Sequence, residues 1–285
     1  LRETLHYQKP HAFLLRREKT ILPGFPKKEE VHLPCPMSDG EVERHIRLIR
    51  ALKRADARRG LHLSYLHRLV ELYQHPLAHR DDFEVLPVAE LIQASPKLQG
   101  VLSRLEGIRD RGEKALIFAR HIKIQRMLAR VIGETFGLHV SIINGEAGRP
   151  EEGVARGRQH RAAILQRFKS HQGFHTLILS PFVAGVGLTI TEANHVFHYG
   201  RWWNPAVEAQ ATDRVYRIGQ EREVQVHLPI LMDACGRLDK SFDERLHELL
   251  DRKRSLARDF LVPMEDEHSL ASELCQGLSL DASSA

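Results

Sequence analysis

The chain contains 285 residues, of which 42% are hydrophobic and 28% are charged. A chain of this length can bury a full hydrophobic core with room for one appended subdomain, and this balance excludes a disordered or fibrous protein. No apolar run approaches the ~18 residues that a membrane-spanning helix needs, so we expect no membrane partner. The net charge of +5 favours a polyanionic partner but does not identify one.

The cysteines, the histidines and the first residues indicate the redox environment, the absence of a metal site and the place of the chain in a longer protein. Cys35, Cys235 and Cys275 lie far apart in no paired spacing, which argues against a disulfide framework or a cysteine zinc site and fits a reducing cytoplasm. Eighteen histidines include pairs but no nearby third ligand, so we expect no metal site. The chain begins at Leu1 without an initiator Met or a signal peptide, so we expect it to begin inside a longer protein.

The first 95 residues show mainly helical patterns. Ser38 followed by Glu41 is a capping-box signal for a helix running toward Arg58. One side of this helix is apolar, with Val42, Ile46, Ile49 and Leu52. The opposite side is basic, with Arg44, Arg47, Arg54 and Arg58. Two readings of this basic side stay open: a solvated surface, or a phosphate-contacting face if the helix borders a nucleic-acid groove.

From about residue 97 the pattern changes to strands that alternate with helices. Buried strands are predicted at 115–119, 140–143, 176–179, 195–199 and 224–228. Helices are predicted at 122–136, around 164–168, from Asn204 toward Arg217 and from Ser241 to Phe260. Asn204 is a natural N-cap, with Pro205 at the first helical position. This alternation predicts an α/β fold with a parallel sheet that helices cover on both faces.

Two glycines follow the predicted strand 176–179. Gly185 and Gly187 lie in a turn at the carboxyl edge of the sheet, where open α/β sheets bind ligands. Glycines at such a place allow the backbone to approach a phosphate closely. The pair alone is also compatible with an ordinary turn.

Three polar residues share one face of the helix predicted after Asn204. Gln210, Arg214 and Arg217 are separated by four and three positions. Two arginines projecting together suit bidentate binding of phosphate oxygens. A structural ion-pair cluster with Asp213 or Glu208 explains the spacing equally well.

Several segments together resemble one family. ALIFARH (115–121), IINGE and RQHRAAILQRF (142–168), LILSPFVAGVGLTIT (177–191) and RWWNPAVEAQATDRVYRIGQ (201–220) follow one another in the order of the second-lobe helicase motifs of the Swi/Snf family. The stretch 13–34 is similar to the segment that joins that family's two lobes, and SPKLQGVL (95–102) also fits. The resemblance covers roughly residues 10–263.

The resemblance implies the C-terminal lobe of an ATP-dependent translocase of double-stranded DNA, in helicase superfamily two. It implies an inter-lobe linker and helical protrusion at 1–95, a RecA-like parallel sheet with helices on both faces at 96–230, and a brace helix with a tail at 231–285. ATP and Mg²⁺ would be the cofactors of the full-length protein. The partners would be double-stranded DNA and a first RecA-like lobe of the same polypeptide.

The resemblance also implies roles for single residues. Arg217 would be the arginine finger on the ATP γ-phosphate, supported by Arg214 and Gln210. The cleft between the lobes would be lined by Gly185, Gly187 and Asp213. The DNA side would be formed by Arg120, Asn144, Gly145, Arg161, Ser180 and Trp203. For Trp203, core packing is an equally good interpretation.

Some features depart from the family or are missing. Gly200 stands where the family often has Asp, and Thr189 where it usually has Asn, which suggests a divergent, bacterial and nucleoid-associated branch. No GxxxxGK[ST] phosphate loop and no acidic Mg²⁺-binding pair after a strand occur. We therefore expect the chain alone not to hydrolyse ATP. Two alternatives remain: a strand-separating DNA or RNA helicase lobe, and a non-catalytic DNA-binding module.

Overall fold

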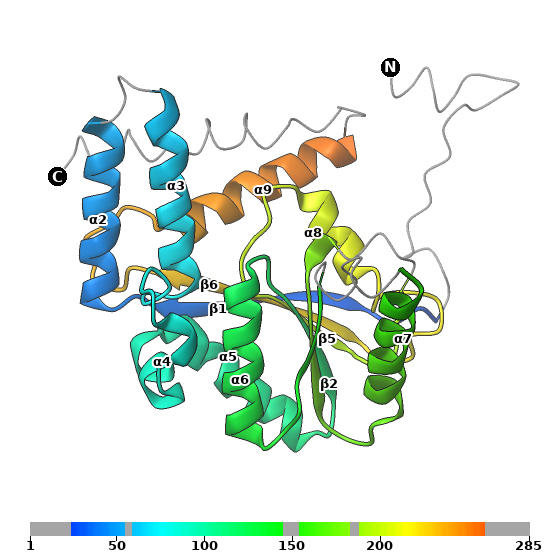
Figure 1. Cartoon of the computed structure of the whole chain (residues 1–285). Coiled ribbons are helices and arrows are strands. Elements are labelled where there is room, and N and C mark those ends of the chain that lie inside the picture. The colour runs from blue at the N-terminus through cyan, green and yellow to red at the C-terminus, as the bar shows by residue number, and fades with distance from the viewer. Residues whose placement is uncertain (1–23, 55–58, 145–153, 183–187, 260–285) are drawn as a thin grey trace, which may run out of the picture.

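A computed structural model describes residues 24–54, 59–144, 154–182 and 188–259 (Figure 1). Of the residues predicted to form the site, Gly145, Gly185 and Gly187 lie outside the described residues. None of the helices in the described ranges is long and apolar enough to span a membrane. Over the same ranges, no group of three or more His, Cys, Asp or Glu side chains could hold a metal ion.

The centre of the fold is a six-stranded sheet in the order β1-β6-β5-β2-β4-β3, with every neighbouring pair parallel. The strands are β1 (Lys28–Pro36), β2 (Lys114–Phe118), β3 (Ser141–Ile143), β4 (His175–Leu179), β5 (His195–His198) and β6 (Val224–Met232). Every residue of β2, β4 and β5 is buried, as expected for a parallel sheet covered on both faces. The predicted α/β fold is confirmed.

Strand β1 was not predicted. It lies within the 1–95 span assigned to the linker and protrusion, yet it pairs with β6 from Lys28 to Pro36. Its sequence, KEEVHLPCP, is charged at one end and contains two prolines. Such a sequence is tolerated at the edge of a sheet, where one side of the strand needs no ladder partner. The sheet therefore extends into the part of the chain that precedes the predicted lobe.

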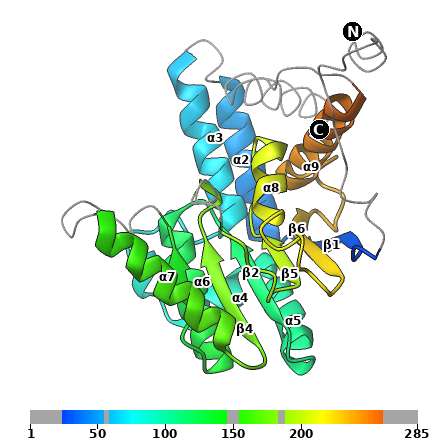
Figure 2. The ribbon, with the colours of Figure 1, turned by 90° about the vertical axis from the view of Figure 1, so that its right-hand side faces the viewer.

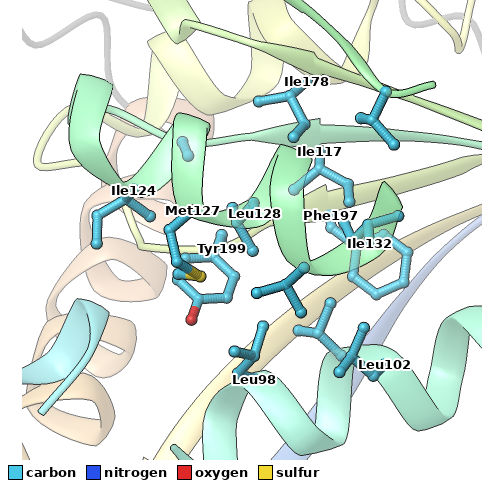
Figure 3. Packing of buried hydrophobic residues seen from close by; sticks show 14 of the residues in the cluster. Leu98, Leu102, Ile117, Ile124, Met127, Leu128, Ile132, Ile178, Phe197 and Tyr199 are labelled. Carbon is cyan, nitrogen blue, oxygen red and sulfur yellow. The ribbon is translucent and has the colours of Figure 1, made fainter. Parts of the chain in front are cut away.

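Helices cover both faces of the sheet. One face packs against α4 (Val88–Ala94), α5 (Pro96–Asp110) and α6 (Ile122–Phe136), and the other against α7 (Val154–Ser170) and the segment after α8 (Pro205–Thr212). A hydrophobic core lies on each face of the sheet. Alternate residues of β2 point into the two cores: Ile117 belongs to the first core and Leu116 to the second. Figure 3 shows the first core, where side chains of α5 and α6 meet those of the central strands.

A third core joins the remaining helices at one end of the sheet. It contains residues of α2 (Asp39–Arg54), α3 (Arg59–Gln74) and α9 (Phe242–Asp259), together with Trp203 and the end of β6. In the two views, α2 and α3 stand as a pair that projects from the sheet, and α9 lies across its end (Figures 1 and 2). The helical hairpin and the C-terminal helix are therefore packed onto the lobe.

The predicted capping box of α2 is present. The Ser38 backbone N donates to the Glu41 carboxylate at 2.8 Å, and the Glu41 backbone N donates to the Ser38 hydroxyl at 3.3 Å. The described part of this helix runs to Arg54, and Arg58, toward which it is predicted to run, lies outside the described residues. On its basic side, Arg44 donates to the Pro76 carbonyl at 2.7 Å, whereas Arg47 is exposed. The basic side is thus only partly a free surface.

Candidate functional site

The carboxyl ends of four strands meet at one edge of the sheet. Phe118 at the end of β2 is in register with Leu179 of β4 and His198 of β5, and Ile143 of β3 is also in register with Leu179. The residues that follow these strands therefore leave the sheet side by side. This carboxyl edge brings together the predicted positions 120, 144 and 180 and the segment 200–203.

Arg120 and two aromatic rings form a stack at this edge. The Arg120 guanidinium lies 4.6 Å from the centroid of the Trp202 ring, close enough for a cation–π interaction. Phe182 meets Trp202 edge to face, with 4.6 Å between centroids and 89° between planes. Trp202 is buried and Phe182 is exposed. We call these three residues the edge stack; Trp202 and Phe182 were not among the predicted site residues.

Asn144 and Ser180 follow β3 and β4 and are buried. The Asn144 side-chain amide donates to Gln125 Oε1 at 2.9 Å, and Gln125 donates in turn to the Ala119 carbonyl at 2.7 Å. The Ser180 backbone N donates to the Ile143 carbonyl at 2.9 Å. These contacts fix the shape of the carboxyl edge. Arg161, also predicted to contact DNA, lies half-buried on α7.

Trp203 has a core position, in line with the second of its two interpretations. It is buried in the third core and meets Phe242 of α9, with 6.0 Å between ring centroids. The assignment of Trp203 to the DNA-binding surface is therefore corrected: its ring supports the turn from inside. The neighbouring Trp202, which is also buried, contacts the exposed Phe182 and the half-buried Arg120. Both indoles are buried, and the sequence pattern RWWNP alone does not reveal which of them packs against Phe242 and which against Phe182.

Close packing against α3 explains why position 200 is a glycine. A Cβ atom at this position would lie 2.0 Å from Nε2 of Gln74, the last residue of α3. A side chain there, such as the Asp that the resemblance leads one to expect, would displace the Gln74 amide. The departure therefore reflects a contact between α3 and the carboxyl edge.

The start of α8 is as predicted, but its end is not. Asn204 Oδ1 accepts from the Ala206 backbone N at 2.9 Å, and Pro205 is the first helical residue. The helix ends at Thr212 and does not reach Arg217. Gln210 is exposed on α8, and Asp213 is exposed at its C-cap. The predicted shared helical face of Gln210, Arg214 and Arg217 is corrected to a short helix followed by a turn.

Arg214 anchors this turn from inside. Its side chain is only 8% exposed, and its Nη1 donates to the Leu188 carbonyl at 3.2 Å. Its own carbonyl accepts from the Ile190 backbone N at 2.9 Å. Burial, and next the charge of Arg217, lower the pKa of Arg214. Among the described residues, none accepts a hydrogen bond from its buried Nε. The prediction that both arginines project together is wrong for Arg214.

Arg217, in contrast, is exposed at the surface of the same turn. Gln220 fixes the turn, because its side-chain amide donates to the Ala193 carbonyl at 2.8 Å and its backbone N donates to the Arg217 carbonyl at 2.9 Å. Gly219 between them has φ +98°, which a residue with a side chain rarely adopts. Within the described residues, no carboxylate is ion-paired with Arg217. A guanidinium presented in this way suits a phosphate group.

Glu208, considered from the sequence as an ion-pair partner of Arg214 and Arg217, pairs with two other arginines. It is 2% exposed and accepts from Arg201 Nε at 3.0 Å, from the Trp202 backbone N at 2.7 Å and from Arg254 Nη2 of α9 at 2.8 Å. Burial opposes its ionisation, but the Arg201 charge and the hydrogen bonds hold the pKa of Glu208 below its usual value. We call Arg201, Glu208 and Arg254 the buried charge cluster. It ties α9 to the start of α8.

The six-stranded parallel sheet with helices on both faces is a RecA-like α/β fold, the fold of helicase lobes. The model of the helicase conserved C-terminal domain matches residues 97–219. The chain is 35% identical over 254 residues to the Bacillus subtilis protein YwqA, whose name describes an ATP-dependent helicase/translocase. This match covers 86% of the chain and 25% of YwqA. The chain is also 37% identical over 205 residues to the Zorya protein ZorD of Escherichia coli, covering 72% of the chain and 18% of that protein.

Solved structures agree with the sequence matches. The SWI2/SNF2 ATPase core of Sulfolobus solfataricus in complex with double-stranded DNA is similar with a TM-score of 0.66 and 27% identity, covering 95% of this chain and 53% of that one. The C-terminal part of the Fun30 ATPase domain has the same fold, with a TM-score of 0.72 over 99% of its chain. The chain belongs to the Swi2/Snf2 family and corresponds to its C-terminal lobe. It spans about a quarter of the length of YwqA.

Proposed function

We propose that this lobe works in an ATP-dependent translocase of double-stranded DNA. In the full-length protein, ATP and Mg²⁺ would bind in a cleft between this lobe and a first RecA-like lobe. The chain contains no phosphate loop or acidic Mg²⁺-binding motif, so those groups would come from the first lobe and the chain alone would not turn over ATP. A bacterial cytoplasm with its nucleoid is the setting in which such a motor would meet DNA.

The observation that carries this proposal is the difference between the two arginines of one turn. Arg217 is exposed and fits the γ-phosphate of ATP, where a guanidinium stabilises charge in the transition state. Arg214 is buried beneath it and acts as a positioning residue through its bond to Leu188. Gln210 and Asp213 are exposed beside the turn and would line the same cleft. Gly185 and Gly187 precede Leu188 and would complete the lining.

The DNA would lie along the carboxyl edge. Arg120 supplies a cation there, and Asn144 and Ser180 shape the edge from inside. Gly145 and Arg161 would extend the contact toward α7. Closing and opening of the nucleotide cleft would make the two lobes grip the sugar-phosphate backbone in turn. Backbone contacts of this kind give little sequence specificity and a steep dependence on salt.

The test is the ATPase activity of the full-length protein with duplex DNA, single-stranded DNA and duplex RNA as activators. We expect duplex DNA to stimulate turnover most, with an apparent affinity that falls steeply between about 50 and 200 mM salt. A parallel strand-separation assay should give no unwinding of a blunt duplex. An ATPase that duplex DNA fails to stimulate contradicts the proposal, and efficient unwinding favours the strand-separating helicase.

A further inference from the structure

Phe182 is an exposed aromatic residue at the carboxyl edge, three positions after the end of β4. Its side chain is 60% exposed. A single exposed apolar residue needs no explanation by itself, because much of any protein surface is apolar. Phe182 differs from such a residue in what lies behind its ring.

The ring of Phe182 is backed by a fixed partner. Trp202 is only 4% exposed, and it lies edge to face with Phe182 at 4.6 Å between centroids. The Trp202 backbone N donates to Glu208 at 2.7 Å, so the residue is tied to the buried charge cluster. Arg120 lies against the same indole ring. The edge stack therefore presents an aromatic surface that needs little ordering before it binds a partner.

The edge stack combines the two groups that bind unpaired nucleic acid. A nucleobase that stacks on an aromatic side chain gains about 1–3 kcal/mol, and a nearby guanidinium can hold the adjacent phosphate. No carboxylate is ion-paired with Arg120 in the part of the chain that the structure describes, so its charge is available to a phosphate. In a regular duplex each base is already stacked on its neighbours, and its faces cannot reach Phe182.

We propose that the edge stack binds an unstacked nucleobase, with Phe182 as the stacking surface and Arg120 holding the adjoining phosphate. The motor would then prefer DNA that contains an unpaired or distorted stretch over a perfect duplex. This inference rests on the proposed function, because it requires DNA to lie along the carboxyl edge. The charge of Arg120 beside the ring favours DNA over an apolar protein surface as the partner.

The test measures equilibrium binding of the full-length protein to two labelled duplexes of equal length. One is perfect, and the other contains a short internal loop of unpaired thymines. We expect the wild type to bind the looped duplex more tightly. Phe182→Leu, which keeps an apolar side chain but removes the aromatic ring, should lower the affinity for the looped duplex about tenfold and leave that for the perfect duplex unchanged.

Two further variants sharpen the result. Phe182→Tyr keeps the aromatic face and should retain the preference. Val85→Ala changes another exposed apolar residue, 77% exposed on the short helix Phe83–Val85, and should change neither affinity. Equal losses on both duplexes, or no loss on either, overturn the inference. A change in ATPase rate without DNA would mark Phe182 as a contact between lobes and would also overturn it.

The result that would contradict the proposed function differs from the result that would contradict the edge stack. A wild-type protein whose ATPase activity does not respond to duplex DNA contradicts the translocase proposal, whatever the Phe182 variants do. A motor that responds to duplex DNA but shows no preference lost in Phe182→Leu contradicts the edge stack alone.

Discussion

The two ends of α8 both hold a pair of arginines, but the two pairs are bonded differently. At the start of the helix, Arg201 and Arg254 both donate to the buried carboxylate of Glu208. In the turn after its end, Arg214 donates to a backbone carbonyl, and no carboxylate in the described residues is paired with Arg217. A guanidinium that is already neutralised by a carboxylate holds the fold together. One that is not can receive an anion from outside the chain.

The largest effect is expected from removing the carboxylate at the start of α8. Glu208→Gln leaves the buried Arg201 without its counter-charge, and losing one partner of a buried ion pair costs about 3–5 kcal/mol. Arg254 keeps its ion pair with Glu30. Chemical denaturation of the wild type and the variant measures this loss. Glu248→Gln on the outer side of α9, where Glu248 pairs with exposed Lys240, is the matched control and should change stability little. Similar losses in both variants would contradict a special role for the buried charge cluster.

The second effect is a loss of stability in acid through His198, which is buried beside the same cluster. Burial lowers the pKa of His198 from 6.5 to about 4 in the folded chain. Between these values the unfolded chain binds the proton more readily, so stability is complete above pH 6.5 and falls as the pH is lowered toward 4. His198 alone should account for about 2 kcal/mol between about pH 7 and pH 5.

Denaturation curves at several pH values check this expectation in the wild type and in His198→Gln. The variant removes the titrating ring and should show a shallower loss of stability in acid, by close to one proton. His198 Nε2 lies 2.9 Å from the Thr212 hydroxyl at the end of α8, so the variant is also expected to be less stable at neutral pH. An unchanged slope against pH would show that His198 is not kept neutral by burial.

A smaller effect is expected at the cap of α8. Asn204→Ala removes the side-chain oxygen that accepts from Ala206, and the loss of such a cap costs about 1 kcal/mol. Asn204→Asp keeps an acceptor and should retain most of the stability. A loss as large as that of Glu208→Gln would mean that the cap supports more than the first turn of the helix.

The smallest change in stability is expected at Arg214. Arg214→Met loses the bond to Leu188 but also removes a buried Nε that has no partner among the described residues, so the two effects should offset each other to within about 1 kcal/mol. Turnover by the full-length protein should still fall, because the turn that carries Arg217 loses its anchor. A loss of several kcal/mol would place Arg214 with the structural arginines instead.

The sequence predicted most regular elements because their signals are local. The apolar runs of β2, β4 and β5, the helix Ile122–Phe136 and the Asn204-Pro205 start of α8 all depend on neighbouring residues. Strand β1 was not predicted because its conformation depends on pairing with β6, which lies almost 200 residues later in the sequence. The same holds at the site: which of Trp202 and Trp203 packs against α9, and which of Arg214 and Arg217 is buried, depends on contacts between segments far apart in the sequence.

The central claim is that Arg217 completes an ATPase site whose other half lies outside this chain. The most direct measurement is DNA-stimulated ATP turnover by the full-length protein carrying Arg217→Ala, together with its affinities for ATP and duplex DNA. Arg222→Ala, at an exposed arginine near the start of β6, is the control. The account predicts that Arg217→Ala lowers turnover about 10³–10⁵-fold while both ligands still bind and Arg222→Ala stays active. Retention of most of the activity by Arg217→Ala would contradict it.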